Sequence, residues 1–529
     1  MRHAVQLGDA LWSGLGTYAR RELEGMATDA SSELGGRAAA AHEMAVWHLY
    51  RNDVDEADRW RGLLDDDVLE HAVVATLIDQ RCGRVEEARA RLEQWINRRP
   101  DDPHLKLHLA NIRNHEAGPG PAGFELFNDV LAAEGAALVV SPEPGAGPLG
   151  LTVEQSQLLD RPDGPLVTVI MPAFNAESTI GPALDSLLAQ THRRLQVIVV
   201  DDSSIDDTAA IAQAAAAADD RIVVLSQDRN CGAYAARNVG LERAEGAYVT
   251  VHDADDWAHP ERIERQVRDL EDFPTVPANV TDWVRADADL VFQPHGRHPY
   301  KIVGKSTASL MVRRELFGVV GPWDHHMRGA ADFEMLRRLQ TRFGAVHHLS
   351  KNLPLAVSLR TPSSLTGSSA TGIQSLWLVN GARRQYLERF VAWNRDDSFP
   401  ASLPFDARHH ARPFPVPALL LGGPTDTMVD VVVTADFTSG SPSVLVALDD
   451  ACSAQRDGRS VALFHQPNSL EALQHDLDER VVEALRKGRL RLLSAGETVR
   501  CVELRHHGGG VPGGALEGGP EVIADREVR

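Results

Sequence analysis

Cysteine is scarce in this sequence of 529 residues, and its scarcity excludes two kinds of site. The four cysteines, Cys82, Cys231, Cys452 and Cys501, lie far apart in the chain. Closely spaced pairs of the Cys-x-x-Cys kind, which hold zinc or form redox centres, are absent. The sequence therefore argues against a zinc knuckle and does not indicate a disulfide framework.

Long hydrophobic runs and an excess of cations are also missing. No apolar stretch reaches the roughly 18 residues of a membrane-spanning helix, and Asp9 interrupts the first helix-like segment, which argues against a signal peptide. Lys and Arg number 54 against 75 Asp and Glu, and this net charge of -21 argues against nucleic-acid binding. We expect a cytoplasmic protein without a membrane span, either free or peripheral at the inner face of the membrane.

Helical periodicity dominates the first part of the chain. From residue 1 to about 140, Leu, Ala, Trp and Val recur at three- and four-residue spacing. The segment Asn52–Ala57 is echoed about 31 residues later by Gly83–Ala88. We interpret residues 1–140 as a tetratricopeptide-like helical domain that would bind an acceptor or a protein partner, with a plain helical bundle as the alternative.

A Pro- and Gly-rich stretch that begins at Ser141 predicts a linker over residues 141–164, and a different pattern follows it. Short β-branched runs then alternate with amphipathic stretches. The expected strands are 166–171, 195–200, 221–225 and 247–251, and the expected helices are 180–190, 208–218 and 233–243. This alternation predicts a mostly parallel, doubly wound α/β sheet within residues 165–400.

Acidic residues cluster where two of the expected strands end. One strand runs into Asp201 and Asp202, and another into Asp253, Asp255 and Asp256. The carboxyl ends of neighbouring parallel strands meet at one edge of the sheet, so these carboxylates should share a crevice and would repel one another without a cation. Carboxylate oxygens select Mg²⁺ or Mn²⁺, which typically bridge a carboxylate to substrate phosphates.

Four ordered blocks give this region a specific resemblance. Residues 166 to about 360 resemble a family 2 glycosyltransferase of the GT-A fold. The blocks that carry the resemblance are Val167–Glu177, Val199–Thr208, Asn230–Gly246 and Asp253–Pro260. Together they cover the family's first strand with its nucleotide loop, its second strand with the acidic turn, its third block and its metal motif.

The resemblance implies roles for individual residues. Pro172, Phe174 and Glu177 would line the nucleotide pocket, with Phe174 near the base, although core packing is an equal alternative for Phe174. Asp202 would bind the base or ribose, and Arg237 would contact the nucleotide or its diphosphate. Asp253 would hold the ribose or sugar, and Asp255 would ligate the metal.

The catalytic base is expected at the start of a helix, in a block that reads Gly-Glu-Asp in the family. Here Asp332 aligns as the base, and Ala331 stands where the family carries Glu. Two residues further on, Glu334 should point away from the site. A helix N-cap is the alternative role for Asp332.

The last part of the chain predicts a further α/β segment. A strand over 429–434, a helix over 444–454 and a strand over 461–464 give a partial α/β segment across residues 413–505, which faintly resembles the first βα unit of a GT-B glycosyltransferase domain. The Gly-rich residues that follow predict a disordered tail over 506–529.

The function that the resemblance implies is an inverting, metal-dependent transfer of a hexose from a nucleotide sugar, with a UDP-sugar favoured. The acceptor would be a glycan, a lipid-linked intermediate or a protein. Two other functions stay open. One is a non-catalytic helical-repeat adaptor with a degenerate transferase domain, favoured only by Ala331. The other is a nucleotidyltransferase, which would normally carry Lys or Arg in the loop 172–180, where neither occurs.

Overall fold

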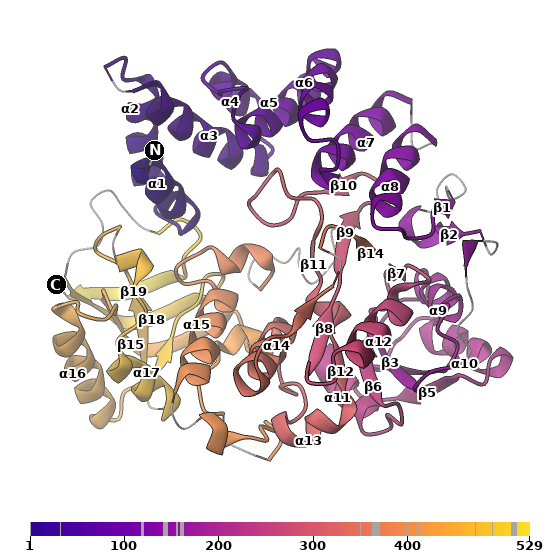
Figure 1. Cartoon of the computed structure of the whole chain (residues 1–529). Helices are drawn as coiled ribbons and strands as arrows, with labels where there is room; N and C mark the ends of the chain where they lie inside the picture. The colour runs from indigo at the N-terminus through magenta and orange to yellow at the C-terminus, as the bar shows by residue number, and fades with distance from the viewer. Residues whose placement is uncertain are drawn as a thin grey trace. The chain divides into compact units, whose positions relative to one another are not determined.

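The chain divides into two compact units, each assembled from separate stretches. The computed structural model describes all residues except 1, 32, 118–120, 141–146, 155–156, 159–162, 350, 362–370, 397–398, 410–411, 471, 489, 509–515 and 529. Unit 1 contains Met1–Cys82, Ser363–Asp396 and Ala411–Arg529, and unit 2 contains Gly83–Pro362 and Asp397–His410. The N-terminal residues that were expected to be one helical domain therefore contribute to both units (Figure 1).

The residues before 140 are helical, as their periodicity predicts. Their helices are α1 (Arg2–Trp12), α2 (Gly16–Thr28), α3 (Leu34–Tyr50), α4 (Val54–Arg61), α5 (Leu69–Arg81), α6 (Val85–Arg98), α7 (Pro103–Ala117) and α8 (Pro121–Ala133). The two segments that echo one another in the sequence both begin helices, α4 in unit 1 and α6 in unit 2. In the part of the chain that the structure describes, no helix combines the length and the apolar character needed to cross a membrane.

The sheet that carries the acidic motifs lies in unit 2. Its strands are β3 (Val167–Ala173), β4 (Leu195–Asp201), β5 (Ile222–Ser226), β6 (Tyr248–Val251), β8 (Ala278–Val280), β12 (Met311–Arg313) and β13 (His347–His348). They are ordered β13-β8-β12-β6-β3-β4-β5. The run β6-β3-β4-β5 is parallel, whereas β12 is antiparallel to both of its neighbours. The prediction of a mostly parallel α/β sheet is confirmed.

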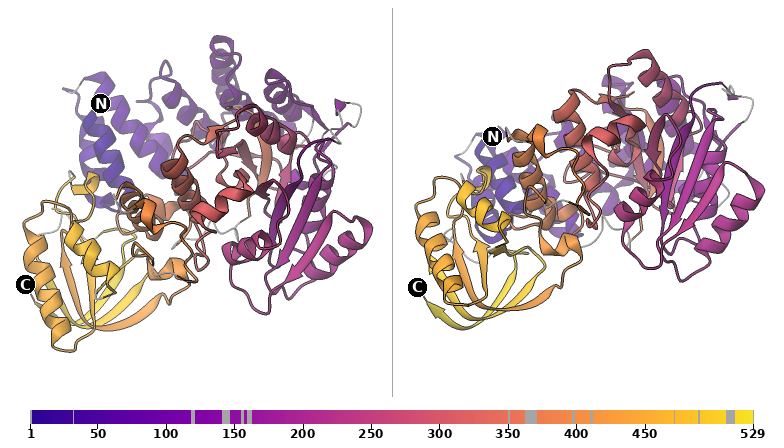
Figure 2. Two further views of the ribbon diagram at one scale, coloured as in Figure 1. Left: turned by 60° about the horizontal axis from the view of Figure 1, so that its bottom comes forward. Right: turned by 90° about the horizontal axis from the view of Figure 1, so that it is seen from below.

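Helices cover both faces of this sheet, as the nearly continuous burial of β3, β4 and β6 requires. The helices α9 (Ile180–Leu188), α10 (Thr208–Ala218) and α12 (Arg262–Asp272) contribute to the core on one face, together with Val169, Val197 and Val199. On the other face α11 (Ala233–Leu241) packs against β3 so closely that a Cβ on Gly240 would lie 2.5 Å from the Ile170 side chain. Figure 2 shows these magenta strands side by side between their helices.

A second, smaller sheet in unit 2 follows the acidic turn. It contains β7 (Asp256–Ala258), β9 (Asp282–Ala286), β10 (Phe292–Gln293), β11 (Gly304–Lys305) and β14 (Pro354–Leu359). The helices α13 (Phe317–Val320) and α14 (Ala331–Phe343) lie between β12 and β13 in the chain. Part of the expected linker is structured, since β1 (Val139–Val140) pairs with β2 (Thr152–Val153), while residues 141–146 lie outside the described residues.

The C-terminal part of unit 1 is a more complete α/β fold than the sequence indicated. Its elements are α15 (Ala382–Arg395), β15 (Asp426–Ala435), α16 (Ser443–Arg456), β16 (Val461–His465), α17 (Glu479–Arg486), β17 (Arg491–Leu492), β18 (Thr498–His507) and β19 (Glu521–Val528). The strands pair in parallel in the order β17-β16-β15-β18-β19, a doubly wound arrangement.

The prediction of a disordered tail over 506–529 is wrong for the residues that the structure describes. Strand β19 pairs with β18, for instance through Val522 and Val499 (Figure 2). The sequence did not reveal β19 because it is an edge strand whose side chains are mostly exposed and often charged, so it lacks the apolar run of a buried strand. The Gly-rich residues 509–515 lie outside the described residues.

Candidate active site

The acidic turn between β6 and β7 brings three carboxylates together within four residues. Asp253 has a side chain that is 34% exposed, whereas Asp256, the first residue of β7, is buried. Burial, followed by the neighbouring charge of Asp253, raises the pKa of Asp255 to about 6. Burial also raises the pKa of Asp256, with Asp255 and Asp253 adding to the effect. The turn therefore holds more negative charge than its surroundings neutralise.

A buried arginine bridges this turn to the expected base. Arg237 lies on α11, and its side chain is only 3% exposed. Its Nη2 donates to Asp253 Oδ1 at 2.9 Å, and its Nη1 donates to Asp332 Oδ1. Burial lowers the pKa of Arg237, but the ion pairs with Asp332 and Asp253 outweigh burial and raise it overall. Three of the residues that the sequence singled out are thus in direct contact.

Asp332 is the second residue of α14, and its carboxylate faces α11. Besides Arg237, Tyr234 contacts it, since Tyr234 Oη donates to Asp332 Oδ2 at 3.0 Å. Burial raises the pKa of Asp332, and this effect outweighs the lowering by Arg237 and Tyr234. A raised pKa suits a carboxylate that accepts a proton near neutral pH.

The alternative role of Asp332 as a helix N-cap is wrong. The N-cap of α14 is Ala330, in the left-handed conformation at φ 69°, and no side chain caps this helix end. The side chain of Asp332 is instead directed to Tyr234 and Arg237. Ala331 is fully buried, so the position that carries Glu in the family presents only a methyl group here.

Glu334 and Arg338 form a separate buried ion pair on α14. Both side chains are 0% exposed, and Arg338 Nε donates to Glu334 Oε1 at 2.8 Å. Arg338 Nη1 also donates to the carbonyl oxygens of Val320 and Pro322, at 2.8 and 2.9 Å. Glu334 therefore anchors α14 to the segment that follows α13 and takes no part in the cluster around Arg237.

The expected nucleotide loop follows β3 and is braced by the turn after β4. The Asn175 N–H donates to Ser204 Oγ at 3.0 Å, and Asn175 Oδ1 accepts from the N–H of Ile205 at 3.0 Å. Glu177 Oε2 accepts from the N–H of Asp207 at 3.2 Å, so Glu177 joins this brace. Phe174 is 48% exposed, so core packing is the wrong explanation for it.

These loop residues share an edge of the sheet with the acidic turn. Strand β3, which ends next to Pro172 and Phe174, pairs in parallel with β6, which ends next to Asp253. Among the described residues, no hydrogen bond or ion pair joins Pro172, Phe174 or Glu177 to the Arg237 cluster. The structure thus places these predicted residues at the same edge without direct contact.

Asp202 follows β4 and is buried beneath the loop that leads into α11. Its Oδ1 accepts from Gln227 Nε2 and from the Cys231 N–H, both at 2.7 Å, and its Oδ2 accepts from the Gly232 N–H at 2.7 Å. Gly232 has a φ of 93°, a conformation that favours glycine. In this structure Asp202 fixes the start of the helix that carries Tyr234 and Arg237.

Sequence reasoning missed Tyr234 and Arg262. Tyr234 precedes Arg237 by three residues on one helix, a spacing that puts both side chains on one face and could have indicated the contact. Arg262, at the start of α12, is buried, and its Nε and Nη2 have no hydrogen-bond partner among the residues that the structure describes. Burial lowers the pKa of Arg262 to about 10, against the raising effect of Asp256 and Asp253. No sequence pattern marks Arg262.

The donor groups present fit a divalent cation only with help from a ligand. In the described parts of the chain, no group of three or more His, Cys, Asp or Glu side chains could by itself hold a metal ion. Asp253 and Asp255 are two carboxylates on one turn, and Mg²⁺ is commonly held by one or two carboxylates together with substrate phosphates. A cation here would also stabilise the charged form of Asp255, whose pKa is raised by burial and then by the charge of Asp253.

Comparison with known proteins finds a family model that matches part of unit 2. Residues 168–322 match the model of glycosyl transferase family 2, which supports the resemblance stated from the motifs. The match includes every predicted site residue except Asp332, which lies ten residues beyond it.

Curated relatives match the chain in part. Glycosyltransferase AglE of Haloferax volcanii is 31% identical over 187 residues, which are 33% of this chain and 61% of AglE. Succinoglycan biosynthesis protein ExoO of Rhizobium meliloti is 41% identical over 103 residues, 20% of this chain and 29% of ExoO. Glycosyltransferase GlyA of Streptococcus pneumoniae is 36% identical over 107 residues, 20% of this chain and 15% of GlyA. The chain thus spans less than two thirds of the length of each of these relatives.

Proposed function

We propose that this chain is an inverting, metal-dependent glycosyltransferase that moves a hexose from a nucleotide sugar, with a UDP-sugar favoured, to an acceptor hydroxyl. The observation that carries the proposal is the contact of Arg237 with both Asp253 and Asp332. It joins a carboxylate of the expected donor site to a carboxylate suited to act as base. The match of residues 168–322 to glycosyl transferase family 2 supports the reaction class.

Each group would have a distinct task in a direct displacement at the anomeric carbon. The acceptor oxygen attacks that carbon while its bond to the nucleoside diphosphate breaks. Asp332 takes the proton of the attacking hydroxyl, a contribution of roughly 10²–10⁴-fold for a general base. Arg237 would contact the nucleotide or its diphosphate. Asp253 and Asp255 would hold Mg²⁺ or Mn²⁺, which neutralises charge on the leaving diphosphate when bound.

The nucleotide would lie over the loop after β3. Phe174 exposes about half of its surface at the carboxyl end of that strand, where it can stack on a base. Pro172, Glu177 and Asp202 border the same edge. The acceptor would be a glycan, a lipid-linked intermediate or a protein, and the helices before residue 140 would bind the acceptor or a partner protein.

The test is release of nucleoside diphosphate from a panel of UDP-, GDP- and dTDP-sugars, with Mn²⁺ or Mg²⁺ and with EDTA. We expect Asp255→Asn to lower the rate about 100-fold or more, because one carboxylate of the metal site is lost. The matched control is Asp220→Asn, which neutralises an exposed aspartate in the same unit and should leave the rate unchanged.

The melting temperature of the same variant is a second readout. Burial raises the pKa of Asp255 to about 6, so the carboxylate is ionised at pH 7.5 and its burial costs stability; Asp255→Asn should therefore not lower the melting temperature at that pH. Activity that survives this substitution would contradict the metal assignment. If no donor sugar supports release by the wild-type chain, the proposal fails, and the non-catalytic helical-repeat adaptor becomes the favoured function.

A further inference from the structure

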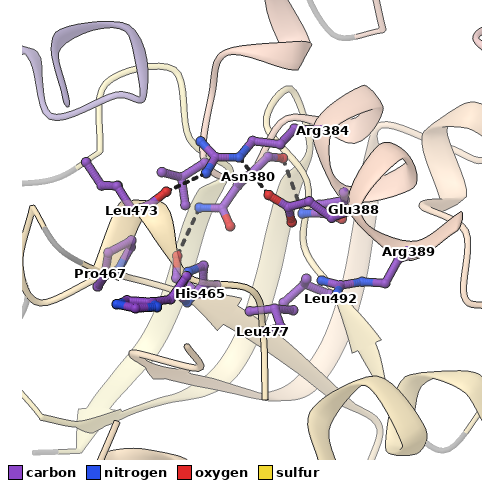
Figure 3. Close-up of a pocket in the computed structure, with 13 residues that line it drawn as sticks. Asn380, Arg384, Glu388, Arg389, His465, Pro467, Leu473, Leu477 and Leu492 are labelled. Carbon is purple, nitrogen blue, oxygen red and sulfur yellow. Dashed lines mark hydrogen bonds and ion pairs between the residues drawn. The ribbon is translucent and has the colours of Figure 1, made fainter. Parts of the chain in front are cut away.

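A cavity at the carboxyl ends of β16 and β17 belongs entirely to unit 1. It lies between these strands and α15, and its empty space of about 330 Å³ includes the open solvent at its mouth. Hydrogen bonds fix α15 there, since Asn380 Nδ2 donates to the His465 carbonyl oxygen at 3.0 Å and Gln385 Nε2 donates to the Leu493 carbonyl oxygen at 3.0 Å. Figure 3 shows the polar side chains that line the cavity. The carboxyl edge of a parallel, doubly wound sheet is where such folds bind ligands.

Two arginines of α15 line this cavity, and they differ in their hydrogen bonds. Arg384 Nε pairs with Glu388 Oε1 at 2.9 Å, and Arg384 Nη2 donates to the Leu473 carbonyl oxygen at 2.8 Å. Arg389 is only 4% exposed, and within the described residues its Nη2 has no hydrogen-bond partner. In Figure 3 the Arg389 guanidinium extends from α15 toward Leu477 and Leu492, which line the cavity. Burial lowers the pKa of Arg389 and outweighs the raising effect of Glu388 and Asp476, so an anion in the cavity would offset the cost of burying this charge.

Besides the donor Arg389 Nη2, the cavity lining holds a hydrogen-bond acceptor that has no partner among the described residues. Asn380 is 1% exposed, and its Oδ1 has no hydrogen-bond partner in the described part of the chain. The orientation of its amide is set, because Nδ2 donates to the His465 carbonyl oxygen. A ligand that fills the cavity should therefore offer a hydroxyl or amine to Asn380 Oδ1 as well as an anionic oxygen to Arg389.

His465 adds a neutral donor to the lining. Its Nδ1 accepts from the Phe437 N–H at 3.1 Å, which leaves the ring proton on Nε2. Burial, together with the charges of Arg384 and Arg389, lowers the pKa of His465 to about 4 against the raising effect of Asp436. The ring is therefore uncharged near neutral pH, and the positive charge of the cavity comes from the arginines.

We infer that this cavity binds a small phosphate ester with a hydroxyl near its phosphoryl group, the chemistry of a polyol or sugar phosphate. The planar guanidinium fork of Arg389 matches phosphoryl oxygens, and Asn380 Oδ1 accepts from the hydroxyl. All the lining residues belong to unit 1, whereas the expected donor residues belong to unit 2, so this inference does not depend on the proposed transferase function.

The test is isothermal titration of the full chain in EDTA with glycerol 3-phosphate, inorganic phosphate and lactate as three separate probes. Glycerol 3-phosphate should bind tightest, because it offers both groups. Arg389→Met should weaken its binding about tenfold or more, as expected for the loss of a charge-assisted contact. The matched control is Arg395→Met, which removes an exposed arginine from the same helix and should change binding less than twofold.

Stability without ligand separates a binding role from a structural one. If Arg389 is kept for an anion, the Arg389→Met chain should melt no lower than the wild type, because the substitution removes a charge whose burial outweighs the effect of the nearby carboxylates. Arg389→Lys keeps the charge without the fork and should also weaken binding.

Three results would overturn the inference. The first is that the wild type binds none of the phosphate probes. The second is that both Arg389 variants bind glycerol 3-phosphate as the wild type does. The third is that inorganic phosphate or lactate binds as tightly as glycerol 3-phosphate, which would reject the phosphate ester as the ligand class.

Discussion

Replacing Tyr234 by Phe tests whether Asp332 is the general base. The substitution keeps the ring, which lies 5.0 Å from the Arg237 guanidinium, and removes only the hydroxyl that donates to Asp332 at 3.0 Å. A hydrogen bond to a charged group contributes about 1.5–3 kcal/mol, and one pKa unit is about 1.4 kcal/mol. Because the Asp332 side chain is 16% exposed and water can replace part of the lost contact, we expect its pKa to rise by about one unit.

The sign of the effect on the rate follows from the role of the base. A base works only when it is deprotonated, so the rate falls as the pH falls through its pKa, and a higher pKa moves this acid limb to higher pH. The assay is the pH dependence of kcat/KM for nucleoside diphosphate release by wild-type and Tyr234→Phe chains. We expect the acid limb of the variant about one pH unit above that of the wild type.

A matched control uses another buried tyrosine of unit 2. Tyr248 donates to Glu271 and accepts from Arg313 Nη1 at 3.1 Å, and neither partner belongs to the Arg237 cluster. Tyr248→Phe should therefore lose stability without moving the acid limb. If Tyr234→Phe retains activity and its acid limb stays in place or moves to lower pH, the assignment of Asp332 as base is refuted.

Two predictions concern stability in unit 2. Glu334→Ala leaves the Arg338 cation buried without its carboxylate, so urea denaturation should show a loss of about 3–5 kcal/mol, and a loss below 1 kcal/mol would contradict the buried pair. Burial lowers the pKa of His108 to about 4, below its unfolded value of about 6.5. The stability that neutral His108 contributes is therefore present above pH 6.5, and about 3 kcal/mol of it is lost as the pH falls toward 4. His108→Gln keeps a donor for the Tyr300 carbonyl oxygen and should lose less stability over this range, and equal losses would reject the linkage.

The α/β core of unit 2 could be predicted because its sequence signals are local. Thr208–Ala218 was expected as a helix from its composition, and the structure has α10 with the same bounds. The acidic motifs were placed correctly at strand ends because they follow short β-branched runs directly. Asp332 could be singled out only through the family resemblance, since no local pattern distinguishes it from other aspartates at the start of a helix.

The rest depends on contacts between distant parts of the chain. Asp202 was expected to bind ligand, but its role in holding Gly232 needs the spatial approach of two loops 30 residues apart. Strand β18 contains the charged residues Arg500, Glu503 and Arg505 among its apolar ones, and β19 is an exposed edge, so neither resembles the apolar strands that the sequence revealed. Arg389 could not be recognised as unpaired from sequence, because the lack of a partner is a property of the folded cavity.

The sharing of one guanidinium by two carboxylates has an energetic consequence for mutagenesis. When Asp253 is removed, Arg237 is left with Asp332 alone, and the environment of the surviving carboxylate changes although it was not substituted. The losses measured for single variants at these positions will therefore not be additive. Each loss will overstate or understate the contribution of the residue that is replaced. A thermodynamic cycle that combines substitutions at Asp253 and Asp332, with Arg237 both present and absent, is the measurement that separates their contributions.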